Sequence, residues 1–250
     1  MHIKDQSREY ESFFVKDPEF FRSLFRILIV VALQGLINYS VNMADNIMLG
    51  AFGQNELSGA ACVSQIFFIL NSLVGNMGVA FSVPAAQYWG QKRPDQINRL
   101  GGILLKTNFT IGTIFFLVSL FFPEQLVSIF SSDPEIIRQG VIYLGILKYT
   151  FIPYSISLML TDLLRNVETV RIAFYMSIIS LVINVVFNYV LIFGKLGFPA
   201  MGVAGAAAAT LIARIVEVCV LVIYVWKFEN KLHFFSSDFL KWDGKIGMIE

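Results

Sequence analysis

The chain has 250 residues, of which 56% are hydrophobic and only 15% are charged. Soluble domains carry about 25% charged residues, so this composition is typical of a membrane protein. The formal net charge of +1 argues against nucleic acid as a partner. The sequence has no phosphate-binding glycine loop, paired-histidine metal motif or nucleophile elbow. We therefore expect a protein that is not an enzyme and that holds no cofactor or structural metal.

The predicted elements begin with residues 1–23, a charged and aromatic stretch expected to form a cytoplasmic amphipathic segment at the level of the lipid headgroups. A membrane-spanning helix needs about 20 mostly apolar residues. The sequence predicts six such spans, at residues 24–49, 57–83, 102–122, 139–163, 172–193 and 202–226. Residues 227–250 are charged again and are expected to be a cytoplasmic linker. The predicted fold class is therefore all-α, a polytopic membrane bundle of six transmembrane helices over residues 24–226.

The distribution of basic residues predicts the orientation. Fifteen of the 19 Lys and Arg residues fall in segments that six spans would place on one side of the membrane. Cytoplasmic loops carry an excess of Lys and Arg, so we expect both termini in the cytoplasm of a multi-pass protein of the cell membrane.

The first span carries the most informative polar residue, Asp45. Gln34, Asn38 and Asn42 precede it at intervals of four, four and three residues, so helical geometry predicts that all four share one stripe. A carboxylate in hydrocarbon is costly and usually faces a wet cavity or a partner. This stripe therefore indicates a pathway for ions or solutes.

Three other spans carry polar stripes of their own. The second has Gln65, Ser72 and Asn76, the fourth has Thr150, Tyr154, Ser157 and Thr161, and the fifth has Ser177, Ser180, Asn184 and Asn188. Each of these residues can simply hydrogen-bond between helices, which contributes about 1 kcal/mol or less per contact. As a collection they favour a shared wet interior, because packing alone does not need whole stripes.

Four of the polar residues are expected to lie at one depth, in the outer half of the membrane. At about 1.5 Å per residue, Asp45, Asn184 and Asn188 can share a layer with Thr210 of the sixth span. One carboxylate with amide and hydroxyl oxygens can complete the shell of a hard cation. The same carboxylate can instead carry a proton.

Two further charged pairs have open interpretations. Arg214 and Glu217 lie near the middle of the sixth span, three residues apart, and can form either a structural ion pair or part of a gating device. Asp162 and Arg165 lie near the inner end of the fourth span, where a local ion pair at the cytoplasmic surface is expected.

Several short motifs together resemble the multidrug and toxic compound extrusion (MATE) family, in its bacterial form. They are 45–50 (DNIMLG), 86–90 (AQYWG), 164–168 (LRNVE), 184–189 (NVVFNY), 192–194 (IFG) and 202–207 (GVAGAA). The resemblance implies a twelve-helix transporter made of two six-helix lobes, of which this chain matches the first. It also implies antiport, in which organic, often cationic, drugs leave as Na⁺ or H⁺ enters.

The resemblance assigns roles to particular residues. Asp45 matches the family's acidic residue in helix 1, and Asn184 matches its asparagine in helix 5. Asn188 stands where some members carry an aspartate, so one carboxylate of the family's pattern is absent here. The implied partners are drug substrates, membrane lipid, and a second six-helix lobe or a second copy of the chain.

Two other functions stay open at the level of sequence. The first is a flippase for lipid-linked sugars from the same superfamily, which an electropositive cavity would favour; the predicted interior has few cations beyond Arg214 and Lys148. The second is a half-length membrane scaffold or partner subunit that transports nothing.

Overall fold

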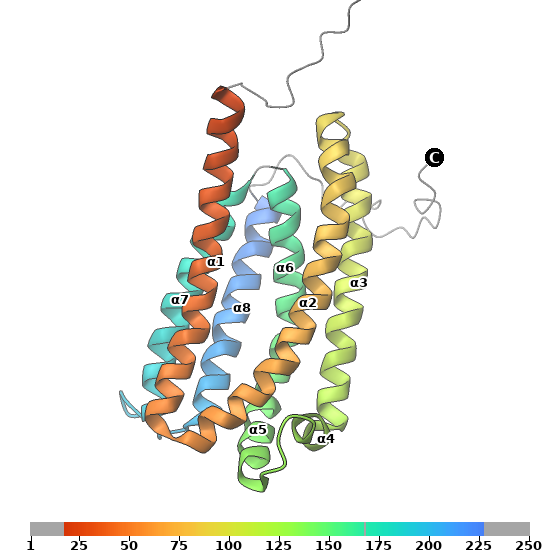
Figure 1. Cartoon of the computed structure of the whole chain (residues 1–250). Coiled ribbons are helices and arrows are strands. Elements are labelled where there is room, and N and C mark those ends of the chain that lie inside the picture. Colours follow the sequence, from red (N-terminus) through yellow and green to blue (C-terminus); the bar gives the residue numbers. More distant parts are fainter. Residues whose placement is uncertain (1–17, 168, 228–250) are drawn as a thin grey trace, which may run out of the picture.

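The computed structural model describes residues 18–167 and 169–227, which form a bundle of helices (Figure 1). Its elements are α1 (Pro18–Phe52), α2 (Gln54–Gly90), α3 (Pro94–Phe121), α4 (Pro123–Ser128), α5 (Pro134–Leu147), the 3₁₀ turn η1 (Lys148–Thr150), α6 (Phe151–Asn166), α7 (Val170–Phe193) and α8 (Val203–Lys227). No strand occurs in these two ranges. Glu168, residues 1–17 of the predicted amphipathic segment and residues 228–250 of the predicted linker lie outside the described residues.

Six stretches of the described chain are long and apolar enough to cross a membrane, which confirms the predicted all-α fold with six spans. They are Leu24–Phe52, Gln54–Gly90, Pro94–Phe121, Pro134–Asn166, Arg171–Phe193 and Val203–Lys227. Most helices extend beyond the predicted bounds, because hydropathy marks only the part that lies in hydrocarbon. The short helix α4 was not predicted. Helix α1 starts at Pro18, so it includes the last residues of the segment predicted over 1–23.

Proline and polar capping residues determine where several helices begin. The Asp133 side chain accepts hydrogen bonds from the backbone N–H groups of Glu135 and Ile136, and Pro134 occupies the first turn of α5. Pro94 has the same place in α3. Pro153 explains η1, since a proline ring clashes with the carbonyl four residues earlier and cannot donate a hydrogen bond to it. The fourth span is therefore two helices joined by a 3₁₀ turn.

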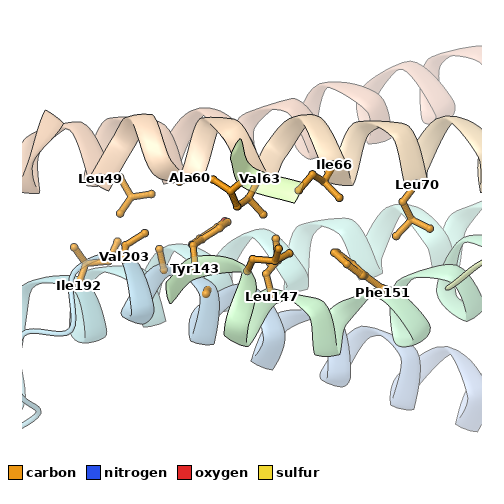
Figure 2. Close-up of a cluster of buried hydrophobic side chains, with 14 of the residues drawn as sticks. Leu49, Ala60, Val63, Ile66, Leu70, Tyr143, Leu147, Phe151, Ile192 and Val203 are labelled. Atoms are coloured by element: carbon orange, nitrogen blue, oxygen red, sulfur yellow. The ribbon is translucent and has the colours of Figure 1, made fainter. Parts of the chain in front are cut away.

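The helices pack in two connected groups. Helix α7 lies against α8 and α1, while α2 lies against α5, α3 and α6, and α8 also contacts α5 and α6. The largest buried cluster joins the groups, and Figure 2 shows its side chains from opposite helices pointing toward one another. Its labelled members are Leu49, Ala60, Val63, Ile66, Leu70, Tyr143, Leu147, Phe151, Ile192 and Val203. This apolar cluster fixes α1, α7 and α8 relative to one another beside the polar residues described next.

Glycines allow two close helix crossings. A Cβ on Gly205 of α8 would lie 2.7 Å from the Leu191 carbonyl carbon of α7. A Cβ on Gly59 of α2 would lie 2.7 Å from the Gly140 backbone nitrogen of α5. Such approaches are typical of membrane helices, whose association depends on close packing. Gly205, near the start of the sixth span, therefore serves the α7–α8 contact.

Candidate functional site

Asp45 lies in a buried hydrogen-bonded network between α1, α7 and α8. The Asn188 side-chain amide donates to the Asp45 carboxylate. The same amide also donates to Asn184 Oδ1 at 3.0 Å, and Asn184 Nδ2 donates to Thr210 Oγ1 at 3.2 Å. All four residues predicted to share one layer therefore belong to a single network, which we call the Asp45 network.

Helix geometry accounts for this arrangement. Asn184 and Asn188 are one turn apart on α7 and so point the same way. Helix α7 packs against both α1 and α8, so its two amides reach Asp45 and Thr210. Asp45 is 8% exposed and Asn188 is fully buried. The network is thus held inside the protein and away from lipid.

The oxygen atoms of the Asp45 network suit a small hard cation or a proton. Asn188 Oδ1 is buried and has no hydrogen-bond partner among the described residues, although its amide nitrogen is fully used. An unpaired buried oxygen is costly, and a cation or a water molecule can satisfy it. Asp45 supplies a carboxylate beside it. Together with the Thr210 hydroxyl they are the ligand types that alkali and alkaline-earth cations use in proteins.

A second buried network surrounds the predicted ion pair in α8. Arg214 Nη1 lies 2.6 Å from Glu217 Oε2, so the ion pair forms. Ser157 of α6 donates to Glu217 Oε1 at 2.6 Å, and Ser180 of α7 donates to Oε2 at 3.4 Å. The Arg214 guanidinium carbon lies 5.2 Å from the Tyr154 ring centroid, a cation–π geometry. We call these residues the Glu217 network.

The predicted pair near the inner end of the fourth span also forms. Arg165 Nη1 lies 3.3 Å from Asp162 Oδ1. The Asp162 carboxylate rests against Gly78 of α2, where any added Cβ would collide with it. Arg165 is partly exposed, so this pair lies at the edge of the packed region.

The predicted cavity-lining residues separate into buried and exposed groups. In α1, Gln34 is buried with Asp45, whereas Asn38 and Asn42 are exposed. The buried positions of this part of α1 are residues 34, 41, 45 and 49.

The other helices divide in the same way. Gln65 and Asn76 are exposed and Ser72 is half-buried, while Thr161 and Ser177 are buried. Ser177 donates to the Ala173 carbonyl of its own helix at 3.1 Å, so it makes no contact between helices through that bond. Tyr154 and Ser180 belong to the Glu217 network, as given above.

One residue of these networks was not predicted. The Tyr154 hydroxyl donates to Asn71 Oδ1 of α2. Asn71 lies one position before Ser72, on a neighbouring helix face. An amide at membrane depth was a usable signal for Asn71.

Comparisons with known proteins agree with this architecture. The MatE family model matches residues 31–190. A probable multidrug resistance protein NorM of Halalkalibacterium halodurans is 29% identical over 219 residues, covering 85% of this chain and 47% of the relative. The probable multidrug resistance protein YoeA of Bacillus subtilis is 25% identical over 232 residues, covering 92% of this chain and 50% of the relative.

A solved structure shares the fold. The crystal structure of MATE in complex with MaL6 superposes with a TM-score of 0.81 at 18% identity, covering 90% of this chain and 49% of that one. The chain therefore spans about half the length of the curated relatives and the solved structure that it matches.

Proposed function

The chain belongs to the MatE family, and from this premise we propose that it forms the N-terminal lobe of a cation-coupled antiporter. The antiporter exports organic, often cationic, drugs and toxic compounds across the cell membrane while Na⁺ or H⁺ enters. Two of its relatives are named as probable multidrug resistance proteins, which supports drug export. Their greater length supports a second six-helix lobe as the structural partner.

The observation that carries the proposal is the Asp45 network. It combines the buried Asp45 carboxylate with the unpaired side-chain oxygen of Asn188. The network lies between three helices and depends on how they pack. An entering Na⁺ or H⁺ neutralises Asp45 and satisfies the neighbouring oxygens. A cation bound more tightly in one conformation than in the other shifts the equilibrium between them, which couples its entry to drug export.

The test is dye efflux from proteoliposomes that contain the chain joined to its second lobe, under an imposed Na⁺ or proton gradient. Efflux of a cationic dye should follow one of the gradients. Asp45→Asn should abolish gradient-driven efflux with unchanged protein yield, because the change removes the charge while keeping the shape of the side chain.

Asp162→Asn is the matched control, since it also neutralises an acid in a transmembrane helix but removes only the ion pair with Arg165. This control should retain efflux. Full activity of Asp45→Asn, or equal loss in both variants, contradicts the assignment of Asp45.

A further inference from the structure

The Asp45 network and the Glu217 network are neighbours along two helices. On α7, Asn184 of the first network and Ser180 of the second are one turn apart. On α8, Thr210 and Arg214 have the same relation. Residues four apart point to the same side of a helix, so the two networks occupy successive layers, separated by about 6 Å of helix rise.

Three hydrogen bonds hold the Glu217 carboxylate inside the bundle. Its carboxylate receives hydrogen bonds from Ser157, Ser180 and Arg214, which come from α6, α7 and α8. Its side chain is only 14% exposed. Three donors from three packed helices therefore determine where the carboxylate lies in the bundle.

Arg214 is bound on one side only. Among the described residues, its guanidinium donates one hydrogen bond, to Glu217, and stacks on Tyr154. A guanidinium has five N–H donors and stays charged at any physiological pH. Because Arg214 is one turn from Thr210, its positive charge lies in the layer next to Asp45. Two carboxylates, Glu217 and Asp45, can therefore pair with Arg214. In the structure Arg214 forms its ion pair with Glu217.

We propose that Glu217 is a positioning residue for the cation site: it holds Arg214 and offsets its charge, so that Asp45 remains available to a cation. The inference rests on the proposed function, because it presupposes that Asp45 binds the coupling ion. Without Glu217, the charge of Arg214 is unopposed beside Asp45. The guanidinium then either pairs with Asp45 or repels any cation that approaches it.

The experiment measures binding of radiolabelled Na⁺ to the whole chain, purified in detergent, for the wild type and three variants. Glu217→Gln should weaken binding roughly tenfold or more, the effect of an uncompensated charge in the adjacent layer. Arg214→Gln should bind as tightly as the wild type or more tightly. The double variant should return close to the wild type, because it restores the balance of charge.

Proton binding to Asp45 is measured in parallel from the infrared absorption band of its protonated carboxyl group. The band is assigned to Asp45 because it is lost in Asp45→Asn. The variants are expected to rank in the same order for proton affinity as for Na⁺ affinity, since Arg214 repels any cation. Glu217→Asp, which keeps the charge, should recover most of the lost affinity. If Glu217→Gln does not fold, Ser157→Ala combined with Ser180→Ala loosens the carboxylate instead and should weaken binding in the same direction.

A purely structural role gives a different pattern. If the Glu217 network only holds helices together, both single variants weaken binding and the double variant weakens it most, and that result overturns the inference. Wild-type binding by Glu217→Gln also overturns it, provided that Asp45→Asn abolishes binding. Unchanged binding by Asp45→Asn instead contradicts the proposed function itself.

Discussion

At the scale of residues, the Asn188 side chain determines which groups of the Asp45 network are left for an ion. Asn188 uses its amide nitrogen twice, toward Asp45 and toward Asn184, and leaves its oxygen unpaired. An aspartate at this position would remove both donated hydrogen bonds and add a second carboxylate. The side chain at position 188 therefore determines how much negative charge the network offers to an ion.

Asn188→Asp is expected to tighten Na⁺ binding by roughly tenfold, because two adjacent carboxylates share one cation more favourably than a carboxylate and an amide. A binding isotherm with radiolabelled Na⁺ measures the change. Asn38→Asp is the matched control, because it adds the same charge at an exposed position of α1 and should leave the affinity unchanged. Equal tightening in both variants would mean that overall charge matters and position does not.

The four residues of the Asp45 network were predictable from sequence because charge and depth are both readable there. An acidic residue in an apolar span is expected to pair with polar groups. Counting residues from the helix ends gives its depth in the membrane. Asn71 carried a similar signal, an amide at membrane depth, and was not predicted. The sequence did not reveal which polar positions of the first span are buried: Gln34 and Asp45 are buried, whereas Asn38 and Asn42 are exposed.

At the scale of elements, the crossing of α2 and α5 depends on glycine. A Cβ at Gly59 would meet backbone atoms of Gly140 and Gln139, which cannot rotate away. A Cβ at Gly75 in the same helix would meet nothing within 4 Å. The two glycines are alike in sequence and differ only in what lies across from them.

Gly59→Ala should lower the free energy of unfolding by about 1–3 kcal/mol, the usual cost of forcing an extra methyl group into a packed interface. Gly75→Ala should leave it unchanged or raise it by about 0.5–1 kcal/mol, since alanine favours the helix. Thermal unfolding in detergent, followed by circular dichroism, measures both. A loss of similar size in the two variants would show that helix flexibility, and not the crossing, explains the effect.

Hydropathy predicted that six spans exist, because the cost of burying polar backbone and side chains in lipid is large. It could not predict α4 or the division of the fourth span. Both depend on local hydrogen bonding and on Pro123 and Pro153, which act within a few residues and leave the average apolarity unchanged.

At the scale of the whole molecule, orientation is a separate prediction from fold. Six spans place residues 91–93 and 194–201 on opposite sides, and the basic residues favour the first group inside. In a chain with Cys62 and Cys219 replaced by serine, a membrane-impermeant maleimide added to intact cells should label Leu196→Cys. It should label Gln91→Cys only after the membrane is opened. The reverse pattern would invert the topology.

A second prediction concerns the solitary lobe. Alternating access requires two bodies that rock about a shared site. The described chain is one bundle with exposed amides on α1 and α2, including Asn38 and Gln65. Reconstituted as a demonstrable monomer, the 250-residue chain should therefore move no cationic dye under a Na⁺ or proton gradient. Gradient-driven movement by the monomer would refute the assignment of the chain as one lobe.

The contact between Asp45 and Asn188 also constrains how the protein is made. The two residues are 143 positions apart in the chain. At about 5–20 residues per second, a ribosome needs roughly 7–30 s to synthesise that interval. Helices α1 and α2 are joined through Gly53 alone and can enter the membrane as a hairpin long before α7 exists (Figure 1). During that time the Asp45 carboxylate exists in the nascent chain before its partner Asn188 has been translated. We therefore expect Asp45 to stay hydrated until α7 is inserted beside α1.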